Sequence, residues 1–139
     1  MIGIPRDLLE RIRAHGAESY PEECCGTLLG NGDGARKVVR LTRPLANSRE
    51  SGREHRYLIG PEAYSEAEAA ARAEGLEVVG IYHSHPDHPA RPSEHDREHA
   101  WPWFSYVIVS VERGRPLGLT SWVLAEDRAR FHEEEVQCP

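Results

Sequence analysis

The sequence predicts an α/β (α+β) fold in which helices flank a mixed β-sheet, formed by a single domain of residues 1–139. Three segments carry helix signals, seven short runs are rich in apolar and β-branched residues, and glycine or proline turns separate them. The chain has 139 residues, of which 39% are hydrophobic and 29% are charged. This size and composition suit one packed domain of ordinary dimensions.

The helix signals lie at the segment ends as much as in their interiors. Pro5 suits the first position of a helix, and apolar residues at helical spacing follow it. Pro61 opens an alanine- and glutamate-rich segment that Gly75 closes, as glycine commonly does at a helix C-terminus. The three expected helices span residues 5–20, 61–74 and 93–100.

The expected strands are short, and turn residues bound them. Asn31, Gly32, Asp33 and Gly34 form a strong turn signal between two apolar runs, which predicts a β-hairpin. A second turn is expected at residues 114–116, where glycine and proline lie close together. The expected strands span residues 25–30, 37–41, 55–59, 76–82, 104–111, 117–124 and 129–132, and the polar segment 47–54 is expected to be a loop.

Charge and composition exclude several classes of protein. The net charge is −6 and the 17 Lys and Arg residues are dispersed, which argues against a nucleic-acid partner. No stretch of about 18 apolar residues is present, so no membrane span is expected. The N-terminus lacks a signal-peptide pattern, and we therefore expect a cytoplasmic location. The three cysteines, Cys24, Cys25 and Cys138, are a poor disulfide framework and are expected to be reduced thiols, with Cys25 packed in the core.

Three side chains are expected to converge on one metal ion. His83 and His85 follow the strand predicted at 76–82, and alternate residues of a strand share a face. Ser93 suits the N-cap of the next helix and places Asp96 at its third position, in a capping-box arrangement. Two imidazoles and one carboxylate can hold zinc and leave its fourth position open for water, which is typical of a catalytic site. The sequence therefore predicts a metal-dependent hydrolase.

Such a hydrolase also needs a base and a hydrogen-bond donor to the developing oxyanion. With three protein ligands, a zinc-bound water has a pKa of about 7, and a side chain must take its proton and return it to the leaving amine. Glu22 and Glu23 precede the strand at 25–30 and are both candidates for this base. The Ser93 hydroxyl is a candidate donor to the oxyanion, unless it serves only as the helix cap.

The combined motif resembles that of JAMM (MPN+) metalloproteases. That family has a glutamate upstream, then His-x-His-Pro, then Ser-x-x-Asp after seven residues counted from the second histidine. Here His85 is followed by seven residues and then by Ser93 and Asp96, and Glu-x-Cys-Gly is matched at residues 23–26. Asn47 matches another position that is common in the family. The resemblance covers residues 5–135, and the whole motif is far more specific than His-x-His alone.

The resemblance implies a role for each residue. His83, His85 and Asp96 would bind one Zn²⁺ per chain, Glu23 would act as general acid and base, and Ser93 would support the oxyanion. It also implies a fold similar to that of cytidine deaminases and cleavage of isopeptide or peptide bonds after a C-terminal Gly-Gly. This chain is short and lacks the insertions of eukaryotic members, and in this it resembles bacterial and archaeal members of the family. Some of those act on ubiquitin-like or sulfur-carrier proteins of the ThiS and MoaD type. The expected partner therefore has a flexible C-terminal tail.

Other interpretations of the sequence remain open. The chain could hydrolyse small peptides or cell-wall stem peptides, or it could be a non-enzymatic binding scaffold with the same fold. A cysteine protease built on Cys24 or Cys25 has little support. The remaining histidines near the motif, His55, His88, His95 and His99, are expected to lie on the surface or beside the ligands, and Trp101, Trp103 and Tyr106 are expected to line a core or groove.

Overall fold

The computed structural model describes residues 1–32 and 35–139 and contains a mixed, eight-stranded sheet. The strand order is β7-β6-β5-β4-β2-β3-β1-β8, in which β4 and β5 are parallel and β2 is antiparallel to both of its neighbours. The predicted α/β fold with a mixed sheet and flanking helices is therefore confirmed. In chain order the strands are β1 (Ile2–Gly3), β2 (Cys25–Gly32), β3 (Lys37–Leu45), β4 (Glu77–Pro86), β5 (Ser105–Glu112), β6 (Arg115–Leu124), β7 (Phe131–Glu134) and β8 (Val136–Gln137).

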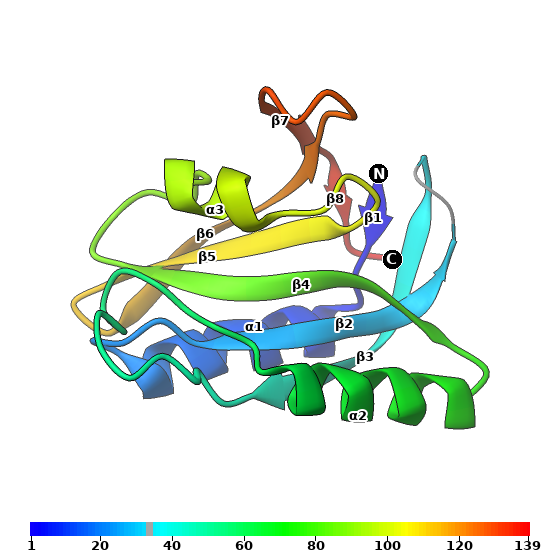
Figure 1. Ribbon diagram of the computed structural model, residues 1–139, viewed down its shortest axis with the longest axis horizontal. Helices are drawn as coiled ribbons and strands as arrows, with labels where there is room; N and C mark the ends of the chain where they lie inside the picture. The colour runs from blue at the N-terminus through cyan, green and yellow to red at the C-terminus, as the bar shows by residue number, and fades with distance from the viewer. Residues whose placement is uncertain (33–34) are drawn as a thin grey trace.

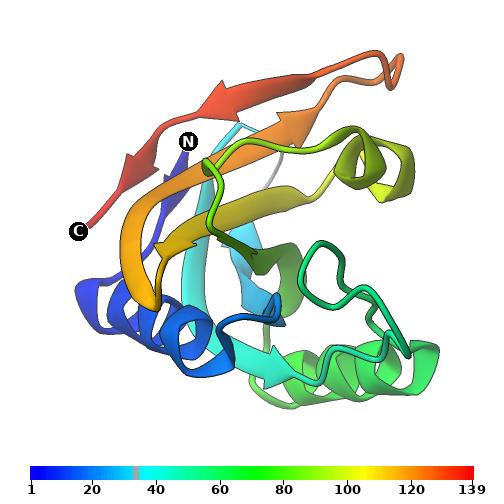
Figure 2. The ribbon, with the colours of Figure 1, turned by 90° about the vertical axis from the view of Figure 1, so that its left-hand side faces the viewer.

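Helices cover both faces of the sheet (Figures 1 and 2). Helix α1 (Arg6–Ser19) lies on one face, and α2 (Pro61–Ala73) and the short α3 (Glu94–His99) lie on the other. Leu8, Leu9 and Ile12 of α1 pack into one buried cluster with residues of the central strands. A second, smaller cluster on the opposite face contains Phe104, Tyr106 and neighbouring aromatic residues. The site described below belongs to this second face.

Most of the expected elements are confirmed, and the differences have local causes. The three helices form within one or two residues of the predicted ranges. The expected strand at 55–59 is wrong, because this stretch is turn and irregular backbone whose amides bond to the Asn47 side chain and to nearby carbonyls. The expected turn at 114–116 is tighter than predicted: Arg113 and Gly114 have positive φ, and β6 begins at Arg115.

Two other sequence-based expectations differ from the structure at strand ends. The β2–β3 hairpin is confirmed, with Gly32 paired to Lys37, but Asp33 and Gly34 of the predicted turn lie outside the described residues. The last of the expected strands, at 129–132, is found over Phe131–Glu134 as β7. The strands β1 and β8 were not predicted. They have two residues each and pair in parallel with one another.

Gly26 gives the first structural prediction, because β2 crosses a fixed aromatic ring at this position. A Cβ atom on Gly26 would fall well inside 3.0 Å of the Cε2, Cζ and Oη atoms of Tyr82. The Tyr82 ring is 1% exposed, and its hydroxyl shares a hydrogen bond of 2.7 Å with Nδ1 of His15, so it cannot move aside easily. We expect Gly26→Ala to lower the free energy of unfolding by roughly 1–3 kcal/mol in urea denaturation.

The matched control for this substitution is Gly118→Ala. Gly118 also lies in a strand, but no atom of the described residues lies within 4 Å of the position its Cβ would take. A loss of stability as large in Gly118→Ala as in Gly26→Ala would show that the Tyr82 contact is not the cause.

Candidate active site and metal centre

Strand β4 carries both histidines of the His-x-His motif on one face of the sheet. From the sequence, His83 was expected just after a strand that ends at residue 82. In the structure His83 pairs with Cys25 of β2 and with Ile108 of β5, so it lies inside the sheet. The alternate residues Tyr82 and Ser84 face α1, where Tyr82 bonds to His15 and Ser84 lies beside Gly16. His83 and His85 therefore point to the opposite face, and both are almost fully buried.

Helix α3 carries the third candidate ligand. The Ser93 hydroxyl accepts a hydrogen bond from the Asp96 backbone N–H at 3.0 Å, and Asp96 Oδ2 accepts one from the Ser93 backbone N–H at 2.8 Å. This capping box confirms the predicted helix start and fixes the Asp96 carboxylate toward β4. Burial alone would raise the pKa of Asp96, but His83, His85 and the Ser93 N–H together hold that pKa well below its usual range.

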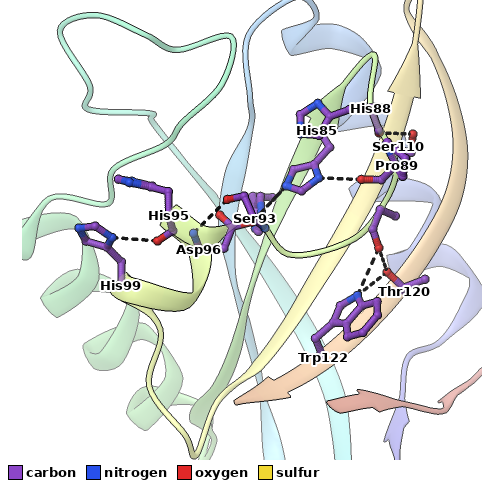
Figure 3. Close-up of polar contacts among 12 residues, drawn as sticks. His85, His88, Pro89, Ser93, His95, Asp96, His99, Ser110, Thr120 and Trp122 are labelled. Carbon is purple, nitrogen blue, oxygen red and sulfur yellow. Dashed lines mark hydrogen bonds and ion pairs between the residues drawn. The ribbon is translucent and has the colours of Figure 1, made fainter. Parts of the chain in front are cut away.

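The three donor atoms form a nearly equilateral triangle (Figure 3 labels His85 and Asp96). The Nε2 atoms of His83 and His85 are 3.2 Å apart, and Asp96 Oδ2 lies 3.2 Å from His85 Nε2 and 3.4 Å from His83 Nε2. A tetrahedral zinc ion with bonds of about 2.0 Å separates its ligands by about 3.3 Å. The spacing of the three donors therefore fits a metal ion of this kind.

The position of the proton on the His85 ring leaves Nε2 available as a metal ligand. His85 Nδ1 lies 2.8 Å from the carbonyl oxygen of Pro89 (Figure 3), which can only accept, so Nδ1 carries the proton. In the neutral ring, Nε2 then presents a bare lone pair to the centre of the triangle. The Pro89 carbonyl was not predicted from sequence, because a backbone acceptor has no residue signature.

Tyr57 supports the other histidine, His83, and this contact was not predicted from the sequence. The Tyr57 ring stacks on His83, with centroids 4.6 Å apart and an interplanar angle of 27°. His83 Nδ1 is buried and has no hydrogen-bond partner among the described residues. On the Nδ1 side, ring packing and the position of His83 in β4 therefore set the orientation of the ring, without a hydrogen bond among the described residues.

Glu23, and not Glu22, lies beside the histidines. A Glu23 carboxylate oxygen lies within 4.8 Å of ring nitrogens of His85 and His88, whereas Glu22 is part of no such cluster among the described residues. Glu23 is 2% exposed, and its Oε1 has no partner among the described groups. Burial raises the pKa of the Glu23 carboxyl to about 8, although the charge of His85 acts to lower it. Such a carboxyl can accept and return a proton near neutral pH.

Asn47 holds the loop that contains Tyr57. Its Nδ2 donates to the carbonyl oxygens of Glu23 and Arg56, at 3.1 and 3.0 Å, and its Oδ1 accepts from the backbone N–H groups of Arg49 and Leu58. One amide side chain therefore satisfies four backbone groups of the 47–60 loop and of the strand entrance at Glu23. This gives a physical reason for the asparagine noted in the sequence.

We expect Asn47→Ala to lower the free energy of unfolding by roughly 1–3 kcal/mol, because it leaves the Glu23 carbonyl without its partner. Asn47→Asp is the matched comparison, since aspartate keeps the acceptor and loses only the two donors. Urea denaturation of both variants measures the effect. Stabilities equal to that of the unchanged protein would show that the loop does not depend on this side chain.

The four other histidines near the motif, His55, His88, His95 and His99, occupy three environments. His88 stacks on His85 with centroids 4.1 Å apart and bonds to the Pro86 carbonyl, so it lies beside the candidate ligands. His95 and His99 lie on α3, partly or fully exposed, and His55 is exposed in the loop. The geometry therefore adds no fourth donor to the triangle of His83, His85 and Asp96 from among these four residues.

The cysteines are free thiols, and two of them are buried. Burial raises the pKa of Cys24 to about 11 and that of Cys25 to about 12. A thiol in such surroundings stays protonated at neutral pH, and a cysteine nucleophile needs the thiolate. The arrangement argues against a cysteine protease.

An apolar cavity of about 480 Å³ opens beside Asp96, between the 47–60 loop and α3. Aromatic residues dominate its lining, including Tyr57, Tyr64 and Phe104. Trp101 and Trp103 stack at its edge with 53% and 61% of their surfaces exposed, which is unusual for residues of this size. Both therefore line a groove, as expected, whereas Tyr106 is buried and belongs to both the cavity wall and the core.

The family of the chain follows from comparison with known proteins. The family model described as prokaryotic homologs of the JAB domain matches residues 5–125. The chain therefore belongs to this family, and the predicted resemblance to JAMM/MPN+ proteins is confirmed. No helix among the described residues is long and apolar enough to cross a membrane.

Individual relatives agree with this family. A Thermus thermophilus protein named "Probable TtuB-protein conjugate cleaving protease" is 37% identical over 123 residues, which cover 88% of this chain and 76% of the relative. A desampylase of Haloferax volcanii is 36% identical over 106 residues, covering 76% of this chain and 74% of the relative. The solution structure of a Salinibacter ruber protein is 49% identical, covers 100% of this chain and 92% of its own, and superposes with a TM-score of 0.77.

Proposed function

We propose that the protein is a zinc-dependent peptidase that hydrolyses an amide bond at the C-terminus of a ubiquitin-like or sulfur-carrier protein. The observation that carries this proposal is the triangle of His83 Nε2, His85 Nε2 and Asp96 Oδ2, with sides of 3.2 to 3.4 Å. These three residues would hold one zinc ion per chain. A tetrahedral ion has a fourth position, and no donor of the described residues completes a four-membered cluster with them.

Each catalytic role is assigned to a residue of the site. When bound, zinc supplies a Lewis acid that brings the pKa of a coordinated water to about 7. The Glu23 carboxyl is buried, and its Oε1 has no partner within residues 1–32 and 35–139. It takes the proton of the attacking water and delivers it to the leaving amine. Ser93 donates a hydrogen bond from its hydroxyl group to the developing oxyanion. Its role as helix cap does not prevent this, because accepting the Asp96 N–H uses only a lone pair of the oxygen.

The substrate class is supported by the relatives and by the cavity. The relatives are named as a protease that cleaves TtuB-protein conjugates and as a desampylase, and both names support a protein conjugate as substrate. The aromatic cavity beside Asp96 offers an extended tail a binding surface that leads to the candidate metal centre. A carrier of the ThiS or MoaD type, with a flexible tail that ends in Gly-Gly, fits this arrangement.

Cleavage of a defined conjugate tests the proposal. The zinc-loaded protein is incubated with a sulfur-carrier protein joined through its C-terminal glycine to a lysine of a second protein, and in parallel with free dipeptides. Mass spectrometry is expected to show release of the carrier with an intact Gly-Gly carboxylate. Faster cleavage of dipeptides would favour the hydrolase of small peptides, and cleavage of neither substrate by the zinc-loaded protein would favour the binding scaffold.

A further inference from the structure

Helix α3 carries a second cluster of metal-ligand side chains that the proposed reaction does not use. His95, Glu98 and His99 each offer one donor atom, and these atoms lie within 4.8 Å of one another. None of the three belongs to the triangle of His83, His85 and Asp96. Figure 3 shows the rings of His95 and His99 on the side of α3 that faces away from His85.

The two imidazoles lie next to each other on the surface of α3. Residues at positions i and i+4 of a helix are neighbours on its surface, and the ring centroids of His95 and His99 are 4.2 Å apart. His99 Nδ1 lies 2.9 Å from the His95 carbonyl oxygen, to which it donates (Figure 3). The proton is thereby fixed on Nδ1, and the His99 Nε2 lone pair is free for a ligand.

A carboxylate completes the donor set. Glu98 is exposed, and no ion pair engages its carboxylate among the described residues, because the neighbouring Arg97 pairs with Glu94. The backbone around Glu98 is held in place, since Arg128 donates to the Glu98 carbonyl and Arg97 donates to the Arg128 carbonyl. The cluster thus repeats the chemistry of the buried centre, with two imidazoles and one carboxylate.

We propose that His95, Glu98 and His99 form a second binding site for zinc or a similar divalent transition metal, weaker than the site at His83, His85 and Asp96. The second site is weaker for three reasons. Its exposed side chains must lose rotamer freedom to bind, and donors up to 4.8 Å apart must close to about 3.3 Å around a tetrahedral ion. The positive charges of Arg56 and Arg49 also act on His95. The site therefore fills only after the buried one.

Occupancy of this site has a consequence for the aromatic cavity. His95 and His99 both line that cavity, together with the exposed Trp101 and Trp103. A hydrated ion held between the two imidazoles narrows the cavity and adds positive charge to its rim. If the cavity holds the substrate tail, which rests on the function proposed above, excess zinc competes with the substrate and raises KM.

Zinc stoichiometry tests the second site without any substrate. Chelator-treated protein is titrated with zinc chloride by calorimetry, and bound metal is counted after gel filtration in zinc-containing buffer. The unchanged protein is expected to bind two ions, and the double variant Glu98→Gln, His99→Ala only one. The matched control is His132→Ala. His132 is exposed and belongs to no donor cluster among the described residues, so this variant should still bind two zinc ions. One ion on the unchanged protein, or two on the double variant, would overturn the proposal.

A kinetic measurement separates the site from its effect on the substrate. With a cleavable conjugate, excess zinc is expected to raise KM for the unchanged protein and to leave KM of the double variant unaffected. An equal rise in KM for the unchanged protein and the double variant would show that zinc in the second site does not affect the cavity. The number of bound zinc ions would still test whether the second site exists. If no conjugate is cleaved, the proposed function fails, and the count of bound zinc remains a valid test of the second site.

Discussion

Replacing Glu23 by glutamine is expected to lower kcat about 10²- to 10⁴-fold while the protein still binds zinc. Glutamine keeps the size and the carbonyl of the side chain but cannot take a proton from water. Because Glu23 lies outside the triangle of donor atoms and its Oε1 has no partner among the residues that the structure describes, we expect the substitution to leave the ligands undisturbed. Turnover of the carrier conjugate and zinc content by elemental analysis measure the two parts of the prediction.

Glu22→Gln is the matched control for this variant. It changes the adjacent carboxylate, which is partly exposed and belongs to no candidate metal cluster of the described chain. Activity close to that of the unchanged protein is expected for Glu22→Gln. If Glu23→Gln kept full activity, the assigned base would be wrong, and if it lost its zinc, Glu23 would be a ligand instead.

Asp96→Asn is expected to weaken zinc binding more than about 100-fold and to abolish turnover. This effect is larger than is usual when the substituted group only hydrogen-bonds to a metal ligand. The substitution removes the one negative charge of the donor triangle. It keeps an oxygen that can accept the Ser93 N–H, so the start of α3 should be preserved. Calorimetric titration with zinc chloride measures the affinity of the tighter site, and circular dichroism checks the fold.

A second readout is thermal stability. A ligand that binds only the folded state at 100 times its dissociation constant stabilises a protein by about 2.7 kcal/mol, so zinc should raise the Tm of the unchanged protein far more than that of Asp96→Asn. Glu94→Gln is the control, because Glu94 lies on the same short helix, is exposed and, within the described part of the chain, pairs with Arg97 alone. Tight zinc binding by Asp96→Asn would remove Asp96 from the metal site.

Much of the donor triangle could be predicted from the sequence because its geometry is local. The two-residue period of a strand places His83 and His85 on one face, and the Ser93 cap fixes the direction of Asp96 within three residues. Glu23 could be separated from Glu22 only by the family motif or by the fold, since both carboxylates precede the same strand. The residues that complete the surroundings, such as Tyr57 and the Pro89 carbonyl, contact the histidines through tertiary packing and leave no local pattern.

The elements that were missed or wrong show the same limit. Strands β1 and β8 have two residues each, and they pair across almost the whole length of the chain, with Ile2 opposite Val136. So short a strand has no periodicity to detect. The segment 55–59 ends in three consecutive apolar residues, but its Tyr57 and Ile59 side chains pack into the second cluster from a loop. An apolar run indicates burial, and here the Asn47 side chain forms two of the backbone hydrogen bonds that a neighbouring strand would otherwise provide.

On the reverse face of the sheet, the Cys24 N–H donates to Ser84 Oγ at 2.8 Å. This bond joins the residue after Glu23 to the residue between the two histidines, so it holds Glu23 and both imidazoles in fixed positions relative to one another. The cavity, by contrast, is bordered by a loop and a six-residue helix, α3, which can change in sequence without disturbing that bond. Apart from Asp96, the residues that border the cavity can therefore vary while Glu23 and the two histidines keep their positions relative to one another.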